Sequence, residues 1–266
     1  MTIKIDFKYE FYGEKNKPVI LFIHGFMGRG EDWLDVINSL QHEFNCLIID
    51  LPFHGKTTIK EGRSKLTFGR VGKALISLLE VLEVKKCHMV GYSLGGRIAL
   101  YLALRYPDFF HKVVLESASP GLKSEKEIEE RIKQDAQRAQ SLKNEKFPDF
   151  VQEWYKQPIF ANLERHQKFQ ELIDSRMKNE PALLLESLNI LGTAQQPSLW
   201  EELPQLSVPV LLIVGELDNK FKNIAGEMVL KNHNFHPKVI EACSHNVHFQ
   251  NPLQYTNIIQ NFFDKN

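Results

Sequence analysis

The chain has 266 residues, 43% hydrophobic and 25% charged, and its 33 basic and 33 acidic residues balance to a formal net charge of zero. This balance provides no excess of positive charge that would favour binding to nucleic acid or to an anionic membrane. No apolar run is long enough to span a bilayer. We therefore expect one α/β domain with an insertion, acting as a monomer or small homo-oligomer without nucleic-acid partners or membrane insertion.

The three cysteines, Cys46, Cys87 and Cys243, lie far apart in the sequence. Cys46 and Cys87 fall in or beside apolar runs, which favours buried free thiols over a disulfide or a metal site. The first residues alternate as in a strand and lack the apolar core of a signal peptide. We therefore expect a cytoplasmic protein with no metal and no cofactor.

The first half of the chain alternates between apolar runs and helical patterns. Residues 3–12 read as one or two antiparallel edge strands. Near-continuous apolar runs, typical of strands buried on both faces, follow at residues 18–23, 46–50 and 87–90. Apolar residues at helical spacing predict helices over residues 32–40, 68–83 and 97–105.

The second half begins with a strand at residues 112–116, after which Pro120 and Gly121 break the pattern. A stretch rich in charged residues and glutamine follows, with helix-like segments at residues 123–146, 150–155, 164–178 and 182–191. Strands return at residues 208–214 and 238–241, before a closing helix over 253–263. This alternation predicts a mostly parallel, doubly wound sheet from residues 1–118 and 197–266. Residues 119–196 then form a helical cap over the strands' carboxyl ends, where such sheets bind ligands.

The stretch Gly91-Tyr92-Ser93-Leu94-Gly95-Gly96 lies directly between a predicted strand and a predicted helix. A serine on so sharp a turn has a strained backbone and needs small neighbours, which the three glycines supply. Such a nucleophile elbow would lift Ser93 Oγ above the carboxyl edge of the sheet. The alternative, a glycine-rich turn with an incidental serine, leaves the strand before it, the helix after it and the partners downstream unexplained.

A serine is a weak nucleophile alone and needs a base, which in turn needs an orienting carboxylate. In α/β-hydrolase order the acid follows the serine and the histidine comes last. Asp218 follows the strand at 208–214, and we prefer it to Glu216 because it lies deeper in the loop. His245 follows the last strand, and we prefer it to His248 because it lies nearer the sheet edge.

Charge that develops on a substrate oxygen needs preorganised hydrogen-bond donors. The backbone N–H of Leu94, directly after the serine, is one candidate. The second is the N–H of Phe26, in the loop after His24. We expect His24 itself, and His54 in a neighbouring loop, to hold their loops by hydrogen bonds and not to contact substrate.

These features resemble the α/β-hydrolase superfamily across the whole core, and finer details look like the MenH family. The likeness begins in the elbow motif Gly-Tyr-Ser-Leu-Gly-Gly-Arg (91–97) and in Leu-Glu-Ser-Ala-Ser-Pro-Gly-Leu (115–122). It continues through residues 129–131, 154–160, the helix ending at Arg176, and the loops at 215–221 and 245–248. It therefore covers the elbow, the cap and both late catalytic loops.

The resemblance implies a 2-succinyl-6-hydroxy-2,4-cyclohexadiene-1-carboxylate synthase of menaquinone and phylloquinone biosynthesis. Such enzymes eliminate pyruvate from 2-succinyl-5-enolpyruvyl-6-hydroxy-3-cyclohexene-1-carboxylate, a small, multiply anionic carboxylate. Ser93 would act as the base, with its proton relayed to His245, which Asp218 orients. Family anion-binding and pocket-lining positions correspond here to Arg97, Arg131, Arg176, Tyr92 and Trp154. Arginine suits this task because its planar fork grips a carboxylate bidentately.

Read without the resemblance, several of these residues have a plainer interpretation. Arg131 and Arg176 lie on charge-rich helices, where most arginines are solvated surface residues. Trp154 would be assigned to packing within the cap. Arg97 lies on the helix after the elbow, which packs in the core, so its charge must find a partner.

Two positions depart from the family pattern. Phe53 stands where the family usually has the first glycine of Pro-Gly-His-Gly, which puts the local loop geometry in doubt. Ser244 replaces the usual glycine before the catalytic histidine and could alter how that loop turns. Neither change removes a catalytic group.

Two other functions stay open. An ordinary serine hydrolase, acting on a carboxylic ester or a carbon–carbon bond, would share the triad but would not require three arginines converging on one pocket. A ligand-binding protein without catalysis would give no reason to retain Ser93, Asp218 and His245 together. Since fold analogy alone does not decide between them, the cap residues carry the distinction.

Overall fold

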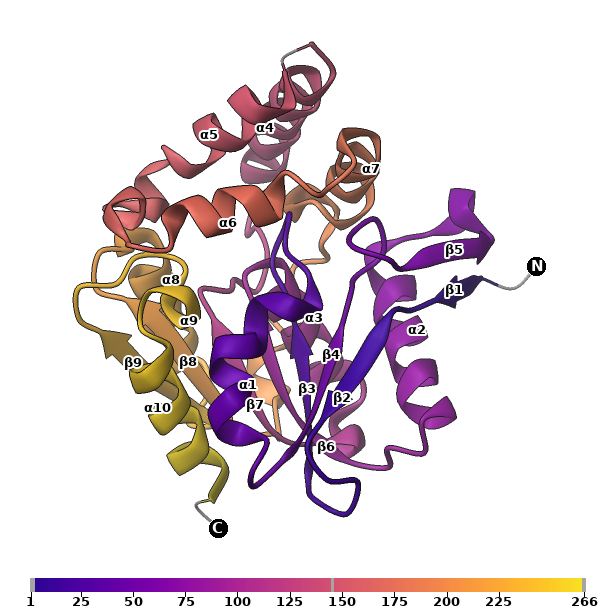
Figure 1. Ribbon diagram of the computed structural model, residues 1–266, viewed down its shortest axis with the longest axis vertical. Coiled ribbons are helices and arrows are strands. Elements are labelled where there is room, and N and C mark those ends of the chain that lie inside the picture. The colour runs from indigo at the N-terminus through magenta and orange to yellow at the C-terminus, as the bar shows by residue number, and fades with distance from the viewer. Residues whose placement is uncertain (1–2, 145, 265–266) are drawn as a thin grey trace.

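The computed structural model, which describes residues 3–144 and 146–264, has the predicted α/β architecture (Figure 1). Its main sheet is built from β2 (Tyr9–Tyr12), β3 (Val19–Ile23), β4 (Asn45–Ile49), β6 (Cys87–Tyr92), β7 (Phe110–Glu116), β8 (Val210–Gly215) and β9 (Phe235–Ile240). The strand order is β2-β4-β3-β6-β7-β8-β9. The edge strand β2 pairs antiparallel with β4, and the other pairs are parallel.

Helices cover both faces of this sheet. The core helices are α1 (Leu34–Leu40), α2 (Phe68–Val81), α3 (Leu94–Arg105), α8 (Asn219–Val229), α9 (Val247–Gln250) and α10 (Pro252–Asp264). Between β7 and β8 lie α4 (Glu125–Asn144), α5 (Phe147–Tyr155), α6 (Phe169–Arg176) and α7 (Pro181–Leu191). Within residues 3–144 and 146–264, no helix is both long and apolar enough to cross a membrane.

Successive side chains of each central strand enter two different cores, because strand residues alternate between the faces of a sheet. On β3, Ile20 and Phe22 pack in one apolar cluster with α1 and α10. Leu21 and Ile23 pack in the other, with α2, α3 and α8. All four side chains are buried. This double burial explains why the strand is a continuous apolar run rather than an alternating one.

Helices α4 to α7 form a separate layer over the carboxyl ends of the strands, at the top of Figure 1. This cap has its own apolar cluster, which also contains the buried Met27 from the loop after β3. The cap is therefore anchored to the core by packing as well as by its two chain connections. The limits expected for it, residues 119–196, remain a prediction.

The structure adds elements that the sequence patterns did not predict. Strand β5 (Thr58–Glu61) pairs antiparallel with β1 (Lys4–Asp6) in a separate two-stranded sheet, so the expected N-terminal edge pair divides between two sheets. Residues 58, 60 and 61 of β5 are exposed, so the strand shows no buried apolar pattern. Helix α8 was also missed, and β9 begins at Phe235, three residues before the predicted strand.

Candidate active site

Ser93 occupies the sharp turn between β6 and α3, with φ 49° and ψ −105°. A non-glycine residue in this region carries about 1–3 kcal/mol of strain, which the surrounding structure must hold. The N–H of Ser93 donates to the carbonyl oxygen of Glu116 at 2.8 Å, and the N–H of Arg97 donates to that of Ser93 at 2.9 Å. The serine is thus fixed between a neighbouring strand and the helix that follows it.

The glycines around Ser93 let α3 pass close to β6 and β3. A Cβ on Gly91 would lie 2.5 Å from the carbonyl oxygen of Gly95, and one on Gly96 would lie 2.6 Å from Cβ of Ala118. A Cβ on Gly95 would overlap the carbonyl group of Ile23. Because most of these neighbours are backbone atoms, they cannot move aside as a flexible side chain could.

We expect Gly95→Ala to destabilise the protein by about 3 kcal/mol, because the added methyl group is forced against the backbone of β3. Urea unfolding followed by circular dichroism measures this. Gly226→Ala in α8 is the matched control, since a Cβ there meets no atom within 4 Å and alanine favours a helix by about 1 kcal/mol. Equal stability of Gly95→Ala and wild type would contradict the close approach of α3 to β3.

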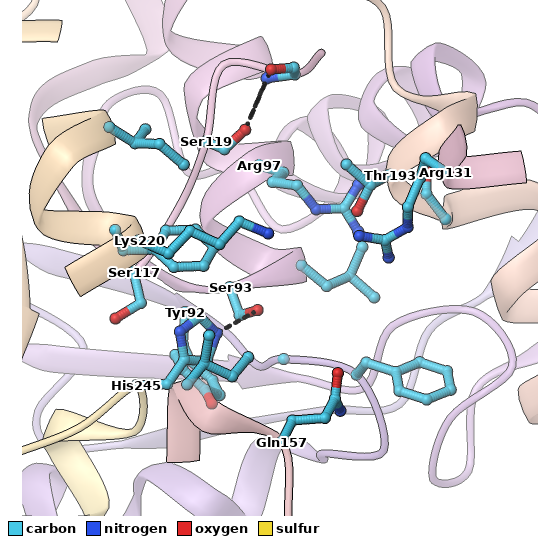
Figure 2. Close-up of a pocket in the computed structure, with 18 of the residues that line it drawn as sticks. Tyr92, Ser93, Arg97, Ser117, Ser119, Arg131, Gln157, Thr193, Lys220 and His245 are labelled. Carbon is cyan, nitrogen blue, oxygen red and sulfur yellow. Dashed lines mark hydrogen bonds between the residues drawn. The ribbon is translucent and has the colours of Figure 1, made fainter. Parts of the chain in front are cut away.

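His245 connects Ser93 to Asp218. Its Nε2 lies 3.1 Å from Ser93 Oγ, the contact drawn in Figure 2, and its Nδ1 lies 2.6 Å from Asp218 Oδ2. Asp218 is 1% exposed, and its other oxygen accepts the N–H of Phe221 at 3.2 Å. With Nδ1 donating to the carboxylate, Nε2 is left to accept the serine proton. The arrangement can therefore activate Ser93 as a nucleophile or as a base.

The sequence rivals of these residues are engaged elsewhere. Glu216 is exposed, and its carboxylate accepts the N–H of Ala242 at 2.9 Å. His248 is buried, and its Nδ1 donates to Glu116 at 2.7 Å. The structure thus places Asp218 and His245, not Glu216 and His248, in line with Ser93.

The loop after β3 runs beside the elbow. A Cβ on Gly25 would lie 2.6 Å from the ring of Tyr92 and 3.6 Å from Cβ of Ser93. Phe26 follows on that loop and lines the same cavity as Leu94, the first residue of α3. The first N–H groups of a helix have no acceptor within it, so that of Leu94 is available to a ligand. The two expected oxyanion donors therefore lie on segments that flank Ser93.

His24 and His54 hold the neighbouring loops. The ring of His24 accepts the N–H of Leu51 at 2.9 Å and donates to the carbonyl of Gly25 at 2.7 Å. His54 accepts the N–H of Met27 at 3.1 Å and donates to the carbonyl of Pro52 at 3.1 Å. Each ring accepts at one nitrogen and donates at the other, which requires the neutral form. Burial lowers the pKa of His24 to about 4 and that of His54 to about 3.

Ser93 and His245 line a cavity of about 700 Å³ between the core and the cap (Figure 2). Basic side chains outnumber acidic ones in its described lining, with Arg97, Lys123, Arg131, Arg138, Arg176 and Lys220 against Glu127 and Glu227. This excess of positive charge suits an anionic ligand. In the described part of the chain, no group of three or more His, Cys, Asp or Glu residues is placed to hold a metal ion.

Arg97 is held by the end of α7 rather than by a carboxylate. Its Nη2 donates to the carbonyl oxygen of Leu191 at 2.8 Å, and its Nη1 donates to Gln196 Oε1 at 3.3 Å. Withdrawal from water, followed by the nearby charge of Arg131, lowers the pKa of Arg97 to about 9. A partly buried cation without a carboxylate partner among the described residues is stabilised when an anion binds beside it.

Arg131 and Arg138, both on α4, share one carboxylate. Arg131 Nε and Arg138 Nη1 donate to Asp135 Oδ1 at 2.8 and 3.0 Å. Two guanidinium groups against one carboxylate leave a net positive charge on this side of the cavity. Arg138 also lies over the ring of Trp154, at 5.4 Å from its centroid, so Trp154 faces the cavity as well as the cap.

Arg176 lines the cavity but already has a counter-ion. Its Nη1 lies 2.7 Å from Asp32 Oδ2, and its Nε donates to the hydroxyl of Tyr155 at 2.9 Å. At 3% exposed it is not a solvated surface residue. Arg176 therefore joins α6 of the cap to the core with its charge largely balanced, unlike Arg97.

Tyr92 lies against His245, with ring centroids 5.5 Å apart. Burial raises the pKa of its hydroxyl well above the usual range, and Tyr155 and Glu116 add to the effect. The hydroxyl therefore stays protonated at neutral pH and can donate a hydrogen bond into the cavity. It is not poised to act as a base.

Sequence reasoning missed some residues that the structure brings into the cavity, among them Arg138 and Lys220. Arg138 lies seven residues after Arg131, two helical turns along the same face, which was a usable signal. Lys220 comes two residues after Asp218. Partial loss of hydration, followed by the nearby charge of Arg131, lowers the pKa of its ammonium group.

The two departures from the family pattern have different consequences. Phe53 adopts φ 70°, a left-handed conformation that favours glycine, and its ring is buried in the core. Ser244 does not have a positive φ. The left-handed backbone conformation in this loop is adopted by Ala242, at φ 56°. The hydroxyl and N–H of Ser244 both donate to Gln250 Oε1, at 2.8 and 2.7 Å. The serine therefore stabilises the loop before His245.

Comparison with known proteins places this geometry in a family. The alpha/beta hydrolase fold matches residues 18–252. The 2-succinyl-6-hydroxy-2,4-cyclohexadiene-1-carboxylate synthase of Serratia proteamaculans is 32% identical over 251 residues, which cover 94% of each chain. The solved structure of MenH from S. aureus is similar with a TM-score of 0.89 and 30% identity, covering 96% of this chain and 97% of that one. The chain belongs to the MenH family.

The relatives differ in how much of their own length this chain spans. Protein PHYLLO, chloroplastic, of Arabidopsis thaliana is 31% identical over 262 residues, which cover 93% of this chain but 15% of that protein. The Serratia relative, in contrast, is matched over nearly its full length. The match to a full-length MenH-family chain includes the core, the cap and both late loops.

Proposed function

We propose that this protein is a 2-succinyl-6-hydroxy-2,4-cyclohexadiene-1-carboxylate synthase. It would eliminate pyruvate from 2-succinyl-5-enolpyruvyl-6-hydroxy-3-cyclohexene-1-carboxylate in menaquinone or phylloquinone biosynthesis. The observation that carries the proposal is that Ser93 and His245, aligned with the buried Asp218, line a cavity with excess positive charge. Family membership supports it, since several relatives carry the name of this synthase.

In the proposed reaction Ser93 Oγ, after passing its proton to His245, removes a proton from the substrate ring. The electron pair of the broken C–H bond at C2 forms a C2=C3 double bond, the existing C3=C4 double bond shifts to C4=C5, and the bond from C5 to the enolpyruvyl oxygen breaks. The leaving enolpyruvate takes up a proton and becomes pyruvate, so no acyl-enzyme forms. Asp218 stabilises the imidazolium of His245 in this step, and the N–H groups of Phe26 and Leu94 face developing negative charge on oxygen.

The arginines supply the substrate preference in this proposal. Arg97 and the Arg131–Arg138 pair present positive charge that no described carboxylate fully balances. A carboxylate of the substrate that binds Arg97 bidentately would replace the lost hydration of the guanidinium. Tyr92 and Trp154 then provide flat walls against the ring. Arg176, which Asp32 neutralises, would shape this end of the pocket and contribute less charge.

The partner is therefore a small anionic carboxylate, and we place the reaction in the cytoplasm. The three cysteines are free and buried in the structure, which suits a reducing compartment. The residues assigned to the reaction supply acid–base and electrostatic chemistry by themselves, so the proposal uses no cofactor.

A paired assay tests the proposal with the purified protein. One arm follows pyruvate release from the enolpyruvyl cyclohexene substrate, and the other follows cleavage of a short-chain aryl ester. Ser93→Ala should abolish both activities. Arg97→Met should lower kcat/KM for pyruvate release by about 100-fold, because losing one partner of a buried charged hydrogen bond costs about 2–5 kcal/mol. It should leave ester cleavage nearly unchanged.

Arg105→Met is the matched control. Arg105 lies on the same helix α3, but at its other end, where it pairs with Glu202. We expect it to retain pyruvate release. Brisk ester cleavage that requires Ser93 and ignores Arg97, with pyruvate release at the uncatalysed rate, would establish a serine hydrolase instead.

A further inference from the structure

A second acid–histidine pair lies behind the triad. Glu116, the last residue of β7, is fully buried, and its two carboxylate oxygens both contact His248. Oε1 accepts the backbone N–H of His248 at 3.1 Å, and Oε2 accepts a hydrogen bond from its Nδ1 at 2.7 Å. The carboxylate therefore holds both the ring and the main chain of α9.

Aromatic rings enclose this pair. The His248 ring stacks on Trp33, with centroids 4.1 Å apart and an interplanar angle of 26°. Its edge meets Tyr92 at 4.9 Å, and its exposed fraction is 3%. The His248 ring is thus held on several sides, and this packing restrains the short helix α9 on which it lies.

The same glutamate also holds the elbow. Its carbonyl oxygen accepts the N–H of Ser93 at 2.8 Å, and it pairs with Tyr92 in the register between β6 and β7. The N–H of the following residue, Ser117, donates to the carbonyl of Ile213 on β8. Glu116 therefore contacts the serine side of the triad through its backbone and the histidine side through its side chain.

His245 lies three residues before His248. The link between them is short, so a shift of α9 moves the loop that carries the catalytic imidazole. The N–H of His245 donates to Ile159 of the cap at 3.0 Å, while the core restrains the loop's other end through Glu116. These two contacts flank the loop that places His245 Nε2 at 3.1 Å from Ser93 Oγ.

We propose that Glu116 and His248 form a buried clamp that sets the position of the catalytic His245 relative to Ser93. They are positioning residues, because neither contacts the reacting atoms. The inference rests on the triad proposed above but not on the identity of the substrate. A clamp of this kind acts on the chemical step, since a misplacement of about 1 Å between reacting groups costs up to ~100-fold in rate.

The test compares five variants with wild type. Glu116→Leu removes both acceptors, and His248→Phe keeps the ring on Trp33 but removes the Nδ1 donor. The double variant Glu116→Leu/His248→Phe replaces the pair with apolar groups. Glu116→Gln is the conservative variant, because an amide can accept the backbone N–H and donate to Nδ1 of the other histidine tautomer. Asn232→Leu removes side-chain bonds to three backbone carbonyls near the opposite end of β8 and controls for general destabilisation.

The first readout is the rate at which a fluorophosphonate reagent labels Ser93, which reports serine activation for any substrate. We expect Glu116→Leu and His248→Phe each to label about 10- to 100-fold more slowly. The double variant should be no slower than the worse single variant, since residues that act as one unit are non-additive. Glu116→Gln should label within about threefold of wild type, and Asn232→Leu at the wild-type rate.

The second readout is pyruvate release, where kcat should fall in Glu116→Leu and KM should stay near the wild-type value because the arginines are untouched. Wild-type labelling by folded Glu116→Leu, or a double variant whose loss is the product of the single losses, overturns the clamp. If Glu116→Leu does not fold, the labelling rate of His248→Phe decides the question. A wild-type protein that labels rapidly but releases no pyruvate would count against the proposed reaction and leave the labelling test of the clamp intact.

Discussion

Replacing Asp218 by asparagine is expected to lower the rate of the Ser93-dependent reaction by about 10⁴-fold. The carboxylate accepts a hydrogen bond from His245 Nδ1 at 2.6 Å, which leaves Nε2 unprotonated toward Ser93. An asparagine can present its amide N–H to Nδ1, so the imidazole adopts the other tautomer and Nε2 no longer accepts the serine proton. Loss of the negative charge also removes the stabilisation of the imidazolium. Changing the tautomer in a comparable triad has an effect of this size.

The measurement is kcat for pyruvate release, together with the fluorophosphonate labelling rate. Glu216→Gln is the matched control, because Glu216 lies two residues away and its carboxylate contacts Ala242 rather than the histidine. We expect that control to keep kcat within about threefold of wild type. A large loss in Glu216→Gln with near-normal activity in Asp218→Asn would show that the acid is wrongly assigned.

We also expect the protein to lose stability steeply as the pH falls from about 6.5 to about 4. Burial lowers the pKa of His24 and His88 to about 4, from an ordinary value near 6.5, and that of His54 to about 3. Below pH 6.5 the unfolded chain therefore binds protons that the folded chain does not, and protonation favours unfolding. A shift of two pKa units or more corresponds to about 3 kcal/mol for one group. Three such groups can remove most of the roughly 5–15 kcal/mol that stabilises a typical domain.

Urea unfolding at pH 7.5 and at pH 4.5 measures this effect. His88 isolates one contribution, because it lies apart from the active site, is 8% exposed, and has no partner for its Nδ1 among the described residues. His88→Leu should reduce the difference in unfolding free energy between the two pH values by about 2–3 kcal/mol. His42→Leu, at an exposed position, is the control and should preserve the difference. If the unfolding free energy of His88→Leu depended on pH as strongly as that of wild type, protonation of His88 would not contribute to the loss of stability.

The elbow could be predicted from sequence because its determinants are local. Gly91, Ser93 and Gly95 lie within five residues, and the strand and helix on either side have strong apolar patterns. Choosing between neighbouring candidates was harder. Asp218 lies two residues after Glu216, and His248 lies three residues after His245, so the choice depends on which side chain the folded chain turns toward Ser93.

Partners that come from distant parts of the chain could not be predicted. Asp32, which pairs with Arg176, lies 144 residues away in sequence and belongs to the core rather than the cap. No local sequence pattern predicts such a pair. An arginine whose charge is free to bind substrate therefore cannot be distinguished, from the helix sequence alone, from an arginine that already has a counter-ion. Strand β5 was missed for a related reason, since its pairing with β1 is a long-range backbone contact without a buried apolar face.

The way Arg97 is held has an evolutionary consequence. The guanidinium that presents charge to the cavity also satisfies the carbonyl oxygen of Leu191, where the last cap helix returns to the core. Replacing Arg97 by an apolar residue would remove this charge and would also leave the buried carbonyl group of Leu191 without its donor. We therefore expect chains of this fold that act on neutral substrates to differ at the end of α7 as well as at the position of Arg97. We expect cationic pockets in such chains to be inherited as a unit with the cap that covers them.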